Sequence, residues 1–194
     1  MSTDYSFLRS LEPVYAYQRN LPHWRQDGVT YFVTFRTADS LPQTKVRRWA
    51  ALRAQWIEDH PEPLSKADRQ EFAELFPMQI QQWLDNGYGA RLLRDPDLRA
   101  IVEDSLRYYD QKNYLLHEYV VAANHVHVMV TPLPGNSLSS VIGAWKAFTA
   151  KRINRRIGRR GVFWQEESYD HIVRSAEDVA RIRLYIAGHR DEQR

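Results

Sequence analysis

Residues 114–131 read YLLHEYVVAANHVHVMVT, which is the most regular apolar pattern in the chain. The runs 114–121 and 125–131 are rich in β-branched and other apolar residues, and a short connection separates them. Such runs are typical of β-strands, and their closeness predicts an antiparallel hairpin. Because side chains alternate between the two faces of a strand, we expect His125 and His127 to point to one face and the intervening valines to the other.

Further strands and helices are expected around this hairpin. The sequence predicts strands at 30–37, which reads TYFVTFRT, and at 169–174, and helices at 95–110, at 137–157 and from 176 onward. Apart from an insertion after the first strand, the order is β-α-β-β-α-β followed by a helix, which is typical of the split βαβ, ferredoxin-like fold. We therefore predict an α+β fold with an antiparallel sheet, helices packed on one of its faces and a further helix at its C-terminal end.

A helical insertion is expected at about 40–90, between the first predicted strand and the helix at 95–110. Residues 44–59 predict a helix, and its apolar stripe comprises Val46, Trp49, Leu52 and Trp56. A second helix is expected at about 65–76, with further helical turns to about residue 86. We interpret residues 1–194 as a single domain that carries this insertion.

The amino-acid composition favours a folded protein and excludes several classes of functional site. The 194 residues are 43% hydrophobic and 12% aromatic, which is sufficient for a folded core. The absence of cysteine excludes disulfides, zinc ribbons and thiol catalysis. No stretch approaches the roughly 20 apolar residues that a membrane helix needs. We therefore expect a cytoplasmic protein with no membrane partner.

Positive charge is concentrated in one segment. Residues 146–160 read KAFTAKRINRRIGRR and hold seven of the 27 lysines and arginines but no acidic residue. The seven candidates for nucleic-acid binding are Lys146, Lys151, Arg152, Arg155, Arg156, Arg159 and Arg160. Residues four apart share a helix face, so these side chains can form rows along a phosphate backbone, and the last two join the rows only if the helix continues past Gly158. A solvated helix face is the alternative interpretation.

Three histidines and one tyrosine are candidates for a metal and nucleophile site. Two imidazoles side by side on one strand face, such as His125 and His127, can bind one metal ion through neutral ring nitrogens. In the last predicted helix, Tyr185 and His189 are four residues apart, so His189 could complete a three-ligand site with Tyr185 nearby. The spacing alone leaves ordinary alternatives open: a chance histidine pair, a core tyrosine and an exposed histidine near a helix end.

Several stretches in order resemble the REP-associated tyrosine transposases, within the HUH single-tyrosine transposase superfamily. They are YFVTFRT at 31–37, NHVHVMV at 124–130, WKAFTAKRIN at 145–154, FWQEESYDHIVR at 163–174 and LYI at 184–186. The resemblance implies that His125 and His127 bind a metal ion, that Tyr185 is the catalytic nucleophile and that His189 assists the metal. The chain departs from the family pattern, in which Met-Pro and Asn-Pro are common, at Ala122, Ala123, His189 and Arg190.

The resemblance also implies a reaction: metal-dependent nicking and strand transfer on single-stranded DNA through a 5′-phosphotyrosine intermediate. The implied cofactor is Mg²⁺ or Mn²⁺, and the implied partner is single-stranded or hairpin DNA, with a homodimer as a further expectation. Two other functions stay open from the residues, namely a non-catalytic protein that binds hairpin DNA or RNA, and a metal-dependent phosphodiesterase that activates water. Tyr169, which shares a predicted strand face with His171, is the second candidate nucleophile.

Overall fold

A computed structural model describes residues 5–9, 15–18, 22–40, 43–61, 65, 67–68, 71, 75 and 89–191. The chain divides into two compact units, of which the smaller comprises Asp39–Arg91 and the larger comprises the residues before and after that stretch. The sheet and the candidate site belong to the larger unit.

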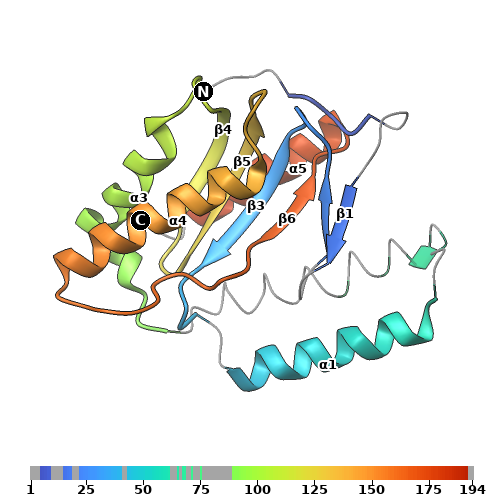
Figure 1. Ribbon diagram of the computed structural model, residues 1–194, viewed down its shortest axis with the longest axis horizontal. Helices are drawn as coiled ribbons and strands as arrows, with labels where there is room; N and C mark the ends of the chain where they lie inside the picture. The colour runs from blue at the N-terminus through green and yellow to red at the C-terminus, as the bar shows by residue number, and fades with distance from the viewer. Residues whose placement is uncertain are drawn as a thin grey trace. The chain divides into compact units, whose positions relative to one another are not determined.

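A four-stranded antiparallel sheet forms the centre of the larger unit (Figure 1). Its strands are β3 (Tyr31–Arg36), β4 (Tyr114–Val121), β5 (His125–Pro132) and β6 (Tyr169–Ile172), in the order β4-β5-β3-β6. Each neighbouring pair is antiparallel. The 3₁₀ helix η1 (Leu92–Arg94) and helix α3 (Pro96–Tyr108) precede β4, and α4 (Leu138–Arg156) follows β5. This β-α-β-β-α-β order confirms the predicted ferredoxin-like fold.

The helix boundaries follow local sequence signals. The Asp95 carboxylate accepts hydrogen bonds from two backbone N–H groups in the first turn of α3. The Ser137 hydroxyl accepts one in the first turn of α4. Such caps satisfy N–H groups that have no partner within the helix. Gly158 follows α4 with a φ of 64°, in the left-handed region that favours glycine, and this conformation ends the helix.

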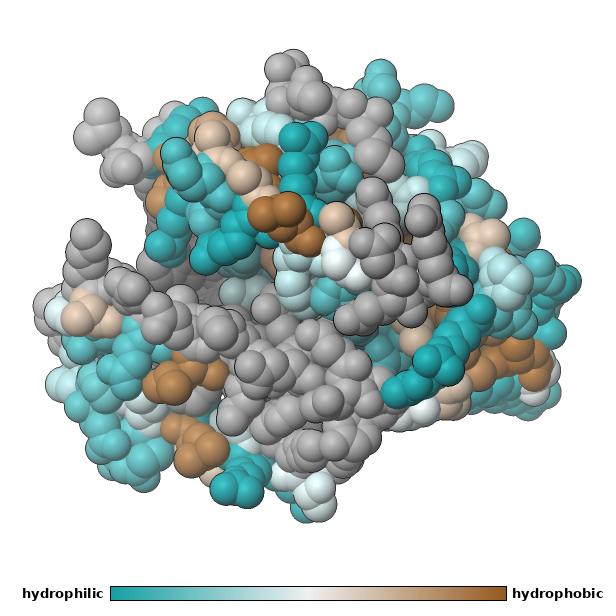
Figure 2. Space-filling model, turned by 180° about the vertical axis from the view of Figure 1, so that it is seen from behind, coloured by the Kyte–Doolittle hydropathy of each residue, from teal (hydrophilic) through white to brown (hydrophobic). Residues whose placement is uncertain are grey.

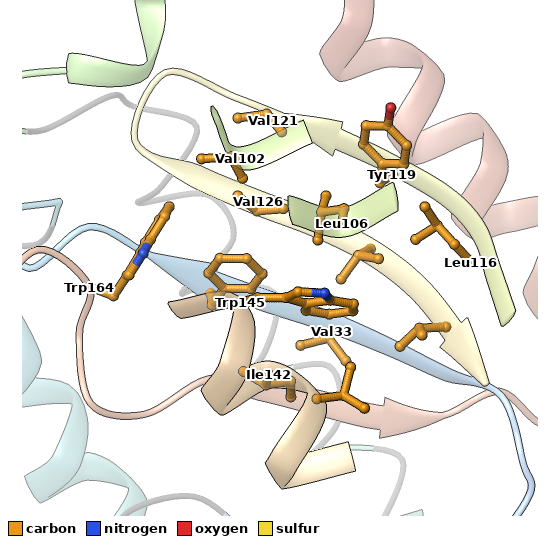
Figure 3. Close-up of a cluster of buried hydrophobic side chains, with 14 of the residues drawn as sticks. Val33, Val102, Leu106, Leu116, Tyr119, Val121, Val126, Ile142, Trp145 and Trp164 are labelled. Atoms are coloured by element: carbon orange, nitrogen blue, oxygen red, sulfur yellow. The ribbon is translucent and has the colours of Figure 1, made fainter. Parts of the chain in front are cut away.

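Helices α3 and α4 cover one face of the sheet with the larger hydrophobic core (Figures 1 and 3). The side chains that fill this layer include Val33, Val102, Leu106, Leu116, Val126, Ile142 and Trp145. Two buried polar groups of this layer are paired, since Trp145 Nε1 donates to Tyr114 Oη (2.9 Å) and Tyr114 Oη donates to the Leu106 carbonyl (2.8 Å). The layer therefore combines apolar burial with paired polar groups, as a stable core requires.

Helix α5 (Ala176–Asp191) covers the opposite face of the sheet (Figure 1). Ile182 and Ile186, which share one face of α5, pack there with Phe32 of β3 and Met129 of β5. The prediction of helices packed on one sheet face is confirmed for α3 and α4. The face of the C-terminal helix was not predicted, and α5 buries its own apolar stripe on the second face. Seen from behind, the described surface is mostly hydrophilic, with isolated apolar side chains (Figure 2).

A two-stranded hairpin that was not predicted precedes the sheet. It consists of β1 (Tyr15–Gln18) and β2 (Pro22–Arg25). Strand β2 lies beside β6, where Arg25 forms an ion pair with the buried Asp170. Each strand has four residues, which is too short for a periodic pattern to stand out in the sequence.

The smaller unit contains α1 (Gln43–Asp59), which confirms the first helix predicted in the insertion. Trp49 and Trp56 are buried as expected, but Leu52 is 49% exposed, whereas Arg53 is buried. The helices expected at 65–86 lie largely outside the described residues. Among the helices that the structure describes, none is long and apolar enough to cross a membrane.

Helix α4 offers a matched pair of positions for a stability test. Ile153 is fully buried, whereas Phe148 on the same helix is 51% exposed. We expect Ile153→Ala to lower the free energy of unfolding by about 2–5 kcal/mol, because it removes buried carbon atoms and leaves a cavity. Phe148→Ala should lower it by about 1 kcal/mol or less. Urea unfolding followed by circular dichroism measures both changes, and equal losses would contradict this packing of α4.

Candidate metal and nucleophile site

Strand β5 and helix α5 bring three histidines together. His125 and His127 lie on the face of β5 that also carries Met129, and His189 reaches them from the last turns of α5. All three are buried, and one ring nitrogen from each lies within 4.8 Å of the other two. The predicted alternation on β5 is confirmed, because the intervening valines belong to the core on the opposite face.

The second ring nitrogen of two of these histidines is held by a carbonyl oxygen. His125 Nδ1 is 2.8 Å from the side-chain Oδ1 of Asn124, and His189 Nδ1 is 3.0 Å from the backbone carbonyl oxygen of Tyr185. A carbonyl oxygen only accepts, so each Nδ1 donates its proton. In that tautomer the lone pair is on Nε2, which is the atom left to bind a metal ion.

The third histidine, His127, is held from the neighbouring strand by a hydroxyl group, which can donate or accept a hydrogen bond. Its Nδ1 is 2.7 Å from the hydroxyl oxygen of Thr34, which lies opposite it in the β3–β5 register. Complete burial, with a smaller contribution from His125 and His189, lowers the pKa of His127 well below its usual value. A neutral imidazole is the form that binds metal ions, so the set of three nitrogen donors fits a single divalent ion.

The phenol of Tyr185 lies at the same place. Its hydroxyl is 3.2 Å from His127 Nε2, and its ring centroid is 4.4 Å from that of His189, one helical turn along α5. The edge of the Tyr185 ring faces Phe32, which belongs to the apolar layer under α5. The tyrosine hydroxyl and the candidate metal ligands therefore meet within one chain.

The rival pair, Tyr169 and His171, lies on β6 and is a weaker candidate. Tyr169 is opposite Thr34 in the register, so β3 separates it from the histidines of β5. Burial raises the pKa of Tyr169 strongly, which keeps the phenol protonated. Burial also lowers the pKa of His171 to about 4, so this imidazole is neutral at pH 7. A desolvated phenol is harder to convert into a nucleophile.

The basic residues predicted to bind nucleic acid lie on or after α4, on the other side of the sheet from α5 (Figure 1). Six of the seven are exposed, namely Lys151, Arg152, Arg155, Arg156, Arg159 and Arg160. The seventh, Lys146, is half-buried, and its Nζ donates to the backbone carbonyl of Glu166 (2.6 Å). Helix α4 ends at Arg156, so the last two arginines do not extend the rows along the helix.

Acidic residues of α3 pair with part of this positive charge. Arg156 forms an ion pair with Asp97, and Arg152 lies over the ring of Phe148, with 5.8 Å from Cζ to the centroid. Asp97 and Asp104 line a groove between α3 and α4 together with three of the arginines. Because these acidic groups partly neutralise the cluster, its excess charge is smaller than the sequence indicates.

Sequence reasoning did not find the residues on β3. Thr34 lies opposite His127, and Arg36 lies opposite His125. No motif marks them, because their place beside the histidines depends on the register between two strands that are far apart in the chain. Asn124 was quoted as part of NHVHVMV without a role, although an amide directly before a strand histidine is a local signal of a ring-nitrogen partner.

Comparison with known proteins agrees with this architecture. The family model of the IS200-like transposases matches residues 88–189, which include β4, β5, α4, β6 and the part of α5 with Tyr185 and His189. A solved structure of a REP-associated tyrosine transposase bound to a REP hairpin is similar, with 17% identity, a TM-score of 0.43 and coverage of 88% of this chain and 68% of that one.

A putative transposase from Deinococcus radiodurans R1 has 14% identity and a TM-score of 0.39, with coverage of 94% of this chain and 98% of that one. No curated protein sequence matches the chain. Both structural likenesses are weak, whereas the family model spans more than half of the residues. On that match, the chain belongs to the family of IS200-like transposases.

Proposed function

We propose that this transposase nicks single-stranded DNA and transfers the strand, with Tyr185 as the nucleophile and a divalent ion bound by His125, His127 and His189. The observation that carries the proposal is the 3.2 Å distance between the Tyr185 hydroxyl and His127 Nε2. Membership of the transposase family supports it. Tyr185 and His189 are one turn apart on α5, so the packing of one helix positions both.

The ion would have three neutral nitrogen ligands. Asn124, Thr34 and the Tyr185 carbonyl each hold one Nδ1, which leaves Nε2 of each histidine for the metal. When bound, Mg²⁺ or Mn²⁺ supplies Lewis-acid polarisation of a phosphate oxygen. Nitrogen ligands favour Mn²⁺ over Mg²⁺, and we expect Mn²⁺ to support the reaction better.

The proposed covalent step is a transesterification at one DNA phosphate. The Tyr185 phenolic oxygen forms a bond to phosphorus, the bond from phosphorus to the 3′-oxygen breaks, and the products are a 5′-phosphotyrosine and a free 3′-hydroxyl. The phenol loses one proton and the 3′-oxygen gains one, so nothing is oxidised or reduced. A phenol has an ordinary pKa of about 10, so it needs activation. Because the number of phosphate ester bonds is unchanged, another 3′-hydroxyl can reverse the step and join strands.

We propose single-stranded or hairpin DNA as the substrate and the cytoplasm as the place of the reaction. A hairpin partner is supported by the REP-hairpin complex of one similar transposase. The exposed basic residues of α4 and the segment after it offer a phosphate-binding surface. The four side chains of the site belong to one chain, so the proposal needs no residue from a second copy, and the homodimer stays a prediction.

Covalent trapping tests the nucleophile. With hairpin DNA labelled at its 3′ end and Mn²⁺, we expect wild-type protein to form an adduct that survives denaturing electrophoresis. Tyr185→Phe should abolish the adduct, whereas Tyr169→Phe should retain most of it, because Tyr169 is separated from the histidines by β3. Binding without cleavage by the wild type would favour a non-catalytic DNA-binding protein. Cleavage that persists in Tyr185→Phe would favour a water-activating phosphodiesterase.

Calorimetry without DNA tests the metal site. We expect one Mn²⁺ per chain, with an affinity that Thr34→Val lowers about 10–100-fold, because the valine no longer holds His127 Nδ1. Thr131→Val is a matched control, since Thr131 is equally buried and its hydroxyl bonds to Thr30 and His117 rather than to the three histidines. Equal Mn²⁺ affinities in the two variants would contradict the proposed role of Thr34.

Salt dependence tests the basic residues of α4. We expect the double substitution of Lys151 and Arg155 to glutamine to reduce the slope of log affinity for hairpin DNA against log salt by roughly 1.5–2, because each phosphate contact contributes about 0.9. The same double change at Arg94 and Lys112, which are exposed outside this segment, is the charge-matched control. Identical slopes for both variants would show that α4 does not contact the DNA backbone.

A further inference from the structure

Arg36 is placed beside the three histidines by the strand register. In the pairing of β3 with β5, Arg36 is opposite His125, just as Thr34 is opposite His127. Alternation along β3 puts Phe32, Thr34 and Arg36 on one face, and the hydrogen bond from Thr34 to His127 identifies it as the face of the site. Directly opposite residues have Cβ atoms about 5 Å apart, so the flexible arginine stem can reach the neighbourhood of the histidines.

The side chain of Arg36 is half-buried, and one nitrogen of its guanidinium has no hydrogen-bond partner. Its Nε is buried with no hydrogen-bond partner, and among the described residues Arg36 forms no ion pair. Burial lowers the pKa of Arg36 to about 10, although the charge of Glu167 acts in the opposite direction. The side chain is therefore still cationic at neutral pH. Holding a partly desolvated cation costs free energy, which an anionic ligand can offset.

Other arginines near α5 have acidic partners. Arg183 pairs with Glu118 (3.3 Å), and Arg181 pairs with Asp178 (2.7 Å). The basic cluster of α4 lies on the opposite face of the sheet. Among the described side chains, Arg36 is the cation that the strand register places directly opposite a histidine of the site.

We infer that Arg36 binds a phosphate group of the DNA strand at the His125–His127–His189 site and neutralises the charge that develops during attack by Tyr185. A guanidinium can donate two parallel N–H bonds to the non-bridging oxygens of a phosphate, and such bonds are stronger where water is partly excluded. This inference rests on the proposed function, because it assigns the substrate-binding group of the same reaction.

A double-mutant cycle between protein and DNA tests the inference. Wild-type protein is first used to map the cleaved phosphate from the covalent adduct. Binding is then measured without metal ions for hairpin DNA with either the natural phosphate or an uncharged methylphosphonate at that position. We expect the methylphosphonate to weaken wild-type binding about tenfold, and we expect Arg36→Gln to bind both DNAs with nearly equal, weaker affinity.

Mn²⁺ binding by Arg36→Gln separates phosphate binding from a structural role. Removing a nearby cation should leave Mn²⁺ affinity in the absence of DNA unchanged or higher, whereas disruption of the histidines would lower it. Arg36→Lys keeps the charge and loses the paired donors, so it should retain part of the coupling, about threefold, and it serves as the test variant if Arg36→Gln does not fold.

The outcomes are distinguishable. Coupling between Arg36 and the cleaved phosphate, with Mn²⁺ affinity retained, supports the inference. An adduct with wild type together with an unchanged methylphosphonate effect in Arg36→Gln, or in Arg36→Lys where that is the variant used, overturns the inference alone. Weakened Mn²⁺ binding without coupling also overturns it, because Arg36 would then only support the histidines. If wild type forms no adduct, the proposed function fails and the inference fails with it.

Discussion

The packing of α5 on the second face of the sheet is the constraint on which the site depends. Ile182 and Ile186 bury their side chains with Phe32 and Met129, and the hydrophobic effect makes this docking favourable without any polar contact. The same docking brings the one-turn pair of Tyr185 and His189 to the histidines of β5. Apolar residues of α5 therefore determine where its polar residues lie, and a helix that bound elsewhere would leave His125 and His127 without Tyr185 and His189.

Burial explains why these histidines suit a cation. His127 has no exposed surface, and burial together with two neighbouring imidazoles makes its protonated form unfavourable. The three rings are neutral, and their Nδ1 atoms already have hydrogen-bond partners. Their lone pairs therefore point toward one another. This arrangement is repulsive among the rings and attractive for a metal ion. Asn124 thus contributes by fixing the tautomer of His125, and Thr34 contributes by orienting the ring of His127, rather than by touching an ion.

Local sequence patterns predicted most strands and helices of the larger unit. They did not predict contacts between residues that are far apart in the chain. Alternation within NHVHVMV was sufficient to place His125 and His127 on one face, because it depends only on neighbouring residues. Thr34 and Arg36 were missed because strand register is set by packing across the sheet.

Positive charge lies on both sides of the sheet, and the two groups of cations have different roles in the proposed function. Those of α4 would bind DNA, and Arg36 would act on the reacting phosphate. The cations on and after α4 are exposed, so in the proposed function they would attract phosphates through water, and their contribution would be sensitive to salt. Arg36 is partly desolvated and lies beside the site, where a single charge acts over a short distance in a less polar environment. In the proposed reaction, a strand held by the first set would still need Arg36 to position one phosphate against Tyr185. Loss of either set should therefore affect different measurable steps of the same reaction.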